Sequence, residues 1–255
     1  MKNLFSIKDK VIIVTGGGNG LGETISIGLA DQDAIVYCFD KKFNQKIKKN
    51  KKNLFQIKCD ITDSKKFEKE CKKIFLKNGK IDSLLNIAGV GIKNSFQFYS
   101  MKNWIKTISV NLTAIFDCSQ IVIKYMIKNN KGSIINFTSI NAEMAFPNNP
   151  AYVASKGGLK MLGKSLAKDW ASKGIRVNNI GPGYFRTEMT EKSYNNKKLR
   201  KERETRTMLG RWGNKEELIG PCIFLISDSS SYITAQDIYV DGGWISNGLS
   251  ELKYD

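Results

Sequence analysis

A glycine-rich turn near the N-terminus constrains the fold of this chain more than any other feature. Residues 10–15, KVIIVT, are typical of a buried parallel strand, and residues 16–22, GGGNGLG, follow at once and open a helical pattern. Glycine allows a sharp turn and close approach of a ligand, and the helix start offers free N–H groups. The turn therefore predicts a dinucleotide site in an open α/β fold. Glu23 stands where a P-loop needs lysine, which excludes that motif.

An acidic residue follows the second predicted strand. Residues 34–39 end at Asp40, about where a nucleotide fold places an acid on the adenosine ribose. A carboxylate there accepts bonds from both ribose hydroxyls and repels the extra phosphate of NADP, so NAD is the expected cofactor. Lys41 and Lys42 keep NADP open as the second choice, because a cation there would pair with that phosphate.

The chain has no histidine, so another group must move protons near neutral pH. Tyr152 and Lys156 stand four residues apart in a helical pattern and share one helix face. A nearby ammonium favours the phenolate, which would lower the pKa of Tyr152 from its ordinary value near 10. The pair predicts an acid–base catalyst.

Several further motifs occur in a fixed order along the chain. They are Thr15, Gly16, Gly20 and Gly22 in a TGxxxGxG pattern; Asn86-Ile87-Ala88-Gly89, close to NNAG; Asn111 in SVNLT; Ser139 in INFTSI; and Pro182, Gly183 and Thr187 in a PGxxxT pattern. With YxxxK, this set resembles the compact single-domain branch of the short-chain dehydrogenases/reductases over essentially the whole chain. The only departure is Ile87 in the NNAG position.

The resemblance implies hydride transfer between a nicotinamide cofactor and a secondary alcohol or ketone. Tyr152 would then transfer the hydroxyl proton, and Ser139 would hydrogen-bond the same oxygen. Lys156 would bind the nicotinamide ribose and lower the pKa of Tyr152, and Asn111 would hold a water that connects Lys156 to solvent. No metal is expected.

The resemblance also implies cofactor contacts from the ends of several strands. The expected contacts are Thr15, Gly16, Asn19, Gly20, Leu21, Gly22, Asp40, Asp60, Ile61, Asn86, Ala88, Gly89, Tyr152, Lys156, Pro182, Gly183, Phe185 and Thr187. Asp60, after the third strand, would contact the adenine.

Apolar strand-like runs alternate with helical runs along the chain, which predicts a doubly wound, Rossmann-like, mostly parallel sheet of seven strands with helices on both faces. The predicted strands are 10–15, 34–39, 53–59, 81–87, 132–138, 175–180 and 237–240, and the clearest helices are 101–129 and 150–172. No linker divides the chain, so one domain of residues 1–255 is expected, with a substrate lid at about 184–210. The two apolar helices and the family resemblance together predict a homotetramer.

The amino-acid composition limits which binding partners and which cellular compartment are expected. Lys and Arg number 41 against 24 Asp and Glu, but the densest run, residues 41–52, lacks the interleaved aromatic residues of nucleic-acid binders. Five cysteines form no CxxC pair, which indicates a reduced cytoplasm and disfavours zinc. No secretion signal is evident, and no segment is expected to span a bilayer. The expected partner is a small, possibly anionic, alcohol or ketone.

The substrate is the least constrained feature. The predicted lid is rich in cations, among them Lys197, Lys198, Arg200, Lys201, Arg203 and Arg206, with Arg186 and Arg211 at its borders. The residues expected closer to the reacting carbon are Lys93, Glu143, Asn148 and Asn149. The C-terminal segment 209–244 is similar to the sugar-acid branch, the gluconate 5-dehydrogenases. A 3-oxoacyl-(acyl carrier protein) reductase and a non-catalytic NAD-binding regulator stay open as alternatives.

Overall fold

The computed structural model describes residues 3–43 and 51–248, which build one twisted sheet of seven parallel strands. The strands are β1 (Val11–Thr15), β2 (Ile35–Asp40), β3 (Leu54–Lys58), β4 (Ser83–Asn86), β5 (Gly132–Phe137), β6 (Ile175–Pro182) and β7 (Asp237–Val240). Their order is β3-β2-β1-β4-β5-β6-β7. The strand order reverses between β1 and β4, which is where an open α/β sheet forms its ligand crevice.

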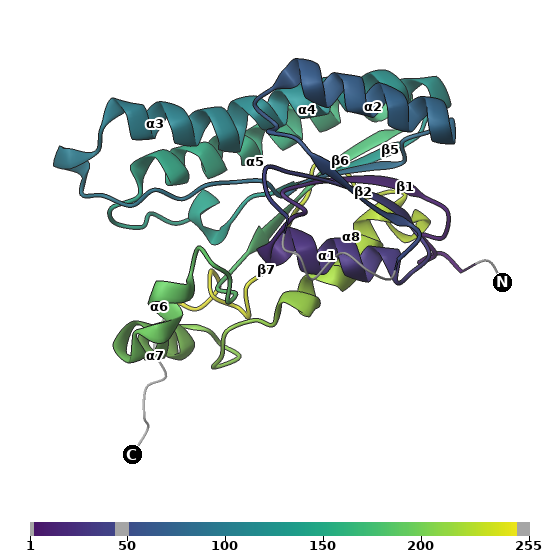
Figure 1. The fold of residues 1–255 in the computed structure, drawn as a ribbon. Coiled ribbons are helices and arrows are strands. Elements are labelled where there is room, and N and C mark those ends of the chain that lie inside the picture. The colour runs from purple at the N-terminus through teal and green to yellow at the C-terminus, as the bar shows by residue number, and fades with distance from the viewer. Residues whose placement is uncertain (1–2, 44–50, 249–255) are drawn as a thin grey trace.

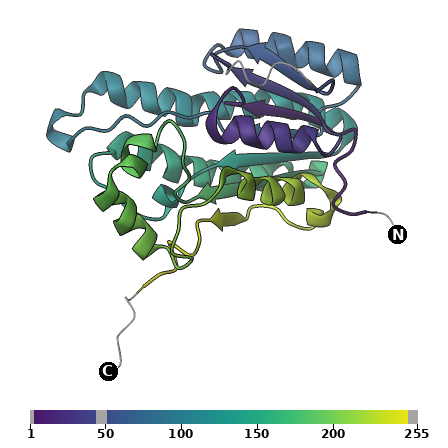
Figure 2. The same cartoon turned by 60° about the horizontal axis from the view of Figure 1, so that its bottom comes forward.

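Helices cover both faces of the sheet (Figure 1). One face carries α2 (Ser64–Asn78), α3 (Met101–Ile108), α4 (Ala114–Met126) and α5 (Pro150–Trp170), and the other carries α1 (Gly20–Ala30) and α8 (Ile219–Ile226). Two more helices, α6 (Glu191–Asn195) and α7 (Lys197–Arg206), stand apart from these layers (Figure 2). The predicted doubly wound fold is confirmed, and every strand begins and ends within two residues of its predicted bounds.

The core has two halves because the strands are buried on both faces. In β1, Val11 and Ile13 pack into the half under α2 and α4, while Ile12 and Val14 pack into the half over α1 and α8. This explains why the strand is continuously apolar rather than alternating. All five cysteines are buried and free, and they act as small apolar side chains in these layers.

One helical run contradicts the expectation that no segment is long and apolar enough to span a bilayer. Residues Met101–Asn129 meet that criterion, although half of their most apolar stretch is buried in the fold. The run consists of α3, a π-helical segment Ser109–Thr113, α4 and a final turn. Its α3 part packs against α5 and its α4 part against α2, so its apolar character serves the protein core.

A buried polar ladder crosses the face of the sheet beneath α5. Asn86, Asn136, Asn179 and Asp237 occupy matching positions on the adjacent strands β4 to β7. The amide of Asn86 donates to Asn136 (2.9 Å), Asn136 donates to Asn179 (3.2 Å), and Asn179 donates to Asp237 (2.7 Å). Each bond satisfies a group that would be costly to bury alone, so the ladder fixes how these strands pair.

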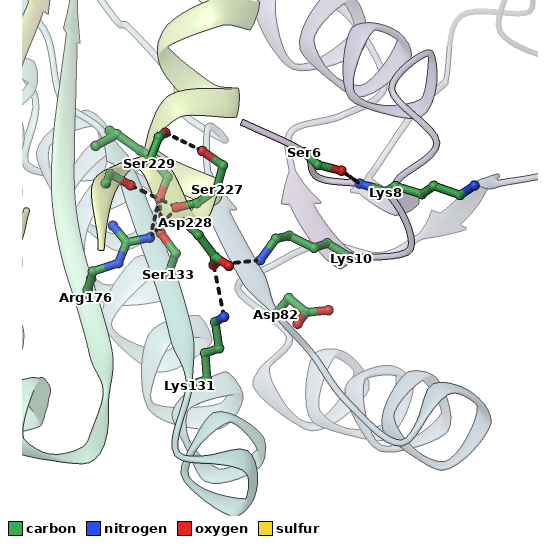
Figure 3. Close-up of polar contacts among 12 residues, drawn as sticks. Ser6, Lys8, Lys10, Asp82, Lys131, Ser133, Arg176, Ser227, Asp228 and Ser229 are labelled. Atoms are coloured by element: carbon green, nitrogen blue, oxygen red, sulfur yellow. Dashed lines mark hydrogen bonds and ion pairs between the residues drawn. The ribbon is translucent and has the colours of Figure 1, made fainter. Parts of the chain in front are cut away.

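The strand ends opposite the crevice are tied by charges (Figure 3). Asp228 pairs with Lys131 at 2.9 Å and with Lys10 at 3.7 Å. Arg176 donates to the carbonyl of Leu225 at 2.7 Å and so caps the end of α8. These bonds attach α8 and the segment after it to β1, β5 and β6. The charged side chains at these strand ends therefore stabilise the fold.

We predict that Gly163→Ala weakens the ladder. A Cβ at Gly163, on α5, would lie 2.4 Å from Asn179 Oδ1 and 3.0 Å from Asn136 Nδ2. Such overpacking typically costs about 1–3 kcal/mol, which urea denaturation should show as a lower midpoint. Gly157, on the same helix, has no neighbour within 4 Å of an added Cβ. Gly157→Ala should therefore gain up to about 1 kcal/mol from helix propensity. Equal effects of the two substitutions would argue against a role for the ladder in stability.

Candidate active site

A cleft of about 660 Å³ lies at the carboxyl ends of the strands. Its lining includes most of the predicted contacts: Gly16, Asn19, Gly20, Leu21, Gly22, Asp40, Asp60, Ile61, Ala88, Gly89, Ser139, Tyr152, Lys156, Pro182, Gly183, Phe185 and Thr187. These residues come from segments spread over more than half of the chain. The parallel sheet brings them together because all its strands point toward this edge.

Three predicted site residues lie behind the cleft wall instead of lining it. Thr15 Oγ1 accepts from the Ile87 and Ala88 N–H groups at 3.2 and 3.3 Å, and so anchors the end of β4. Asn86 belongs to the buried ladder. Asn111 is fully buried and bonds the backbone of Val90 twice, accepting from its N–H (2.8 Å) and donating to its carbonyl (2.9 Å). All three hold strand ends and loops that form the wall.

The glycine turn closes one end of the cleft. Gly16 has φ +70°, and a Cβ there would lie 2.7 Å from Ala88 Cα, so only glycine fits. Gly20 also has positive φ, +57°, and begins α1. The turn thus passes close to the β4 loop and directs the N-terminus of α1 into the cleft, as an anion site requires.

Asp40 and Asp60 line the cleft beside the glycine turn. The Asp40 carboxylate accepts from the Gly18 N–H at 2.9 Å and the Lys42 N–H at 3.2 Å. Lys41 pairs with Asp60 at 2.7 Å, a contact that sequence reasoning missed. Burial acts to raise the pKa of Asp60, but hydrogen bonds from Lys41 and Thr62 together lower it. Most of the predicted basic run, residues 44–50, lies outside the described residues.

Lys156 places a buried ammonium at the centre of the site. Its side chain emerges from α5 one turn after Tyr152 and is only 3% exposed. The ammonium donates to the Phe137 carbonyl at 2.6 Å, at the end of β5, and lies 5.6 Å from the centroid of the Tyr152 ring. Burial lowers the pKa of Lys156 to about 8. An ammonium has three donors, so this one can bind further acceptors that enter the cleft.

The electrostatics of Tyr152 differ from the sequence prediction. Burial raises the pKa of Tyr152, and a hydrogen bond with Ser139 offsets this only in part. The pKa of Tyr152 is therefore raised, and the expectation that Lys156 lowers it is wrong; the Lys156 ammonium lies 5.6 Å from the ring centroid and donates to the Phe137 carbonyl. Ser139 begins the short helix Ile140–Ala142 and accepts from the Asn141 N–H at 3.1 Å.

The predicted lid segment begins with a closed turn whose residues line the cleft. Thr190 Oγ1 accepts from the Thr187 N–H at 2.9 Å and donates to the Phe185 carbonyl at 2.6 Å. Behind this turn, the Arg203 guanidinium of α7 stacks 4.6 Å from the ring centroid of Tyr184, the residue after Gly183. The lid is thus fastened to the end of β6 by a cation–π contact.

The residues predicted near the reacting carbon do not line the cleft, and neither do the predicted lid cations. Glu143 instead bonds Lys160 and Tyr239, and Asn149 precedes α5 as its N-cap. The lining holds several residues that sequence reasoning missed, including Val90, Gly91, Glu188, Met189 and Thr190. The sequence marks these residues only by their positions. Val90 and Gly91 directly follow the NIAG motif, and Glu188, Met189 and Thr190 directly follow the threonine of the PGxxxT pattern. No group of three or more His, Cys, Asp or Glu in the described ranges could hold a metal ion.

Comparison with known proteins gives consistent results. Residues 16–245 match a family described as enoyl-(acyl carrier protein) reductase. Gluconate 5-dehydrogenase of Gluconobacter oxydans is 34% identical over 94% of this chain and 96% of its own length. A 3-oxoacyl-[acyl-carrier-protein] reductase of Thermotoga maritima is also 34% identical, over 94% of this chain and 99% of its own length. The structure of a gluconate 5-dehydrogenase from Burkholderia cenocepacia, solved with NADP and tartrate, has a TM-score of 0.89 to this chain at 30% identity. The match covers 95% of this chain and 98% of the Burkholderia chain.

Burial of Lys156 predicts a specific dependence of stability on pH. Its pKa falls from 10.5 to about 8 on folding, so between these values the unfolded chain binds more protons and stability rises with pH. Relative to Lys156→Met, the wild type should gain on the order of 3 kcal/mol in free energy of unfolding from pH 7 to 10.5. Urea denaturation across this range measures the difference. Lys168→Met, an exposed position on the same helix, is the control. A difference that does not change with pH would contradict the burial of this charge.

Proposed function

The chain belongs to the short-chain dehydrogenase/reductase family and is an oxidoreductase acting on alcohol or ketone groups, and we propose that Tyr152, Lys156, Ser139 and Asn111 carry its reaction. The observation that carries this proposal is the buried ammonium of Lys156 beside Tyr152, at the centre of a cleft that a glycine turn closes. Burying a charge costs free energy, so a buried charge in a cleft marks a functional site. A non-catalytic NAD-binding protein could keep Lys156 for the ribose but would be free to lose Tyr152 and Ser139.

The cleft residues fit a nicotinamide dinucleotide. The N-terminus of α1 suits the pyrophosphate, and Asp40 suits ribose hydroxyls. The Lys156 ammonium, with one carbonyl acceptor, has donors for a second ribose. When bound, the nicotinamide supplies or accepts the hydride.

The chain's own residues would then handle the substrate oxygen. Tyr152 Oη gives a proton to this oxygen in reduction and removes it in oxidation. The Ser139 hydroxyl, which lies within reach of Tyr152, donates a hydrogen bond to the same oxygen and stabilises charge that develops there. Asn111 holds Val90 and thereby the loop that faces Lys156; the water predicted beside Asn111 remains a prediction.

We propose NAD as the preferred dinucleotide. The Asp40 carboxylate lines the cleft. Lys41, which follows it in the chain and also lines the cleft, is already paired with Asp60. A 2′-phosphate would meet the carboxylate first. The Burkholderia relative was solved with NADP, so the preference needs a direct comparison of the two cofactors.

For the substrate, we propose a small polyhydroxylated acid or its ketone, such as gluconate and 5-ketogluconate. The support is the Gluconobacter relative and the Burkholderia structure, which contains tartrate, a small hydroxy acid. The Thermotoga relative, at equal identity, favours a 3-oxoacyl thioester as the second candidate. The formal net charge of +17 would concentrate either anion near the protein.

We further propose that residues 1–255 form one domain whose lid spans about 184–210. We place it in the cytoplasm, since five free cysteines suit a reducing compartment. A homotetramer through α4 and α5 is the proposed assembly. Phe116 of α4 and Met161 of α5 remain 42% and 60% exposed, which leaves apolar surface for a second copy to cover.

The proposed reaction predicts the effect of Tyr152→Phe. Turnover of 5-ketogluconate with NADH, or of an acetoacetyl thioester if that is the substrate, should fall by about 10²–10⁴ because only the proton-transferring hydroxyl is lost. Binding of NADH, followed by its fluorescence, should stay close to wild type. Tyr125→Phe, on α4 and outside the cleft, is the control. A variant that kept more than about a tenth of the wild-type kcat would contradict the role of Tyr152.

Asp40→Asn tests the cofactor preference. The amide oxygen can still accept from the Gly18 N–H, so the glycine turn is kept while the charge is removed. The ratio of kcat/KM for NADH over NADPH should fall roughly tenfold or more, as expected when a like-charge contact is removed. Higher kcat/KM with NADPH in the unmutated protein would show that Asp40 does not control the choice.

A further inference from the structure

Met189 of the lid faces Tyr152 across a glycine. A Cβ built on Gly91 would lie 3.3 Å from Met189 Sδ and 3.8 Å from Tyr152 Cδ2. The thioether and the phenol ring therefore lie on two sides of one small space, and Gly91 leaves that space open. All three residues line the cleft.

The position of Met189 is set by the turn that carries it. Two residues earlier in the same turn, Thr187 lies against the glycine turn, since a Cβ on Gly20 would be 3.8 Å from Thr187 Cβ. Thr190, the next residue, closes the turn through its bonds to Thr187 and Phe185. The lid thus contacts both walls of the cleft, at Gly20 and at Gly91. The Met189 side chain also lines the cleft and is 51% exposed.

We propose that Met189 and Gly91 together form a size gate that limits the substrate to compact groups beside the reacting carbonyl. This inference rests on the proposed role of Tyr152, because the gate is defined by its distance to that ring. A methionine side chain is apolar and adaptable, so it can pack against a small group in this space, and a ring there must displace it. A glycine at position 91 is required because any side chain there fills the space that Met189 and the substrate share.

The gate acts on the group that flanks the reacting ketone on the side of Met189. In 5-ketogluconate one flanking group is a single hydroxymethyl carbon, and in an acetoacetyl thioester one flanking group is a methyl group. Both candidate substrates therefore offer a small group to the space between Met189, Gly91 and Tyr152, whereas a ketone with a ring at this position does not.

The test compares ethyl acetoacetate with ethyl benzoylacetate, in which a phenyl group replaces the methyl group beside the ketone. Met189→Ala should raise kcat/KM for the phenyl ketone relative to the methyl ketone by roughly tenfold or more, the size of effect that a pocket methylene group or two produces. Gly91→Ala should lower kcat/KM for both ketones. The double variant Gly91→Ala with Met189→Ala should recover most of that loss. Met208→Ala, a methionine of similar exposure outside the cleft lining, is the matched control.

A second readout does not depend on activity. In protein labelled with methyl-¹³C methionine, the Met189 resonance is the one that Met189→Ala removes. It should shift in Gly91→Ala while the Met208 resonance does not. An unshifted Met189 resonance, or an unchanged ratio of the two ketones in Met189→Ala, would overturn the gate. A wild type that reduced none of the ketones, 5-ketogluconate included, would instead contradict the proposed function, and the resonance shift would still decide whether the Met189–Gly91 contact exists.

Discussion

The buried ammonium of Lys156 is the interaction on which the rest of the site depends. The Phe137 carbonyl at the end of β5 accepts a hydrogen bond from this ammonium and offsets part of the cost of burying it. The same bond ties α5, the helix that carries Tyr152 beside Ser139, to the end of β5. One buried charge therefore connects the helix of the proposed acid–base residue to the strand end that forms the cleft.

The fold was predictable because its signals are local. Most of the strands are short apolar runs, and a polar residue or a glycine stands within two positions of each strand end, so these patterns can be read from neighbouring residues alone. The residues that meet at the cleft also follow from topology, since parallel strands bring their carboxyl ends to one edge. For the same reason Asp40 and Asp60, which follow β2 and β3, were expected at the cleft and line it.

What the sequence could not supply are contacts that depend on where a side chain points. Lys41 and Asp60 are separated by a segment whose path has no sequence signature, so their ion pair was missed. Glu143 was expected near the substrate because it lies between Ser139 and Tyr152, yet it turns to Lys160 and Tyr239. The pKa of Tyr152 was misjudged because helical spacing shows which residues are neighbours but not which atom the ammonium binds.

The polar ladder has a consequence for how the chain is made. Asn86 and Asp237, the two ends of the ladder, are separated by more than half of the chain. During synthesis from the N-terminus, β4, β5 and β6 emerge before β7, so the Asn179 amide lacks its Asp237 acceptor until nearly all of the protein has left the ribosome. A chain that stops short of residue 237 therefore leaves the Asn179 amide with one acceptor, the Lys160 carbonyl, and leaves β6 as an unpaired sheet edge. An unpaired edge of this kind favours pairing with other chains until β7 covers it.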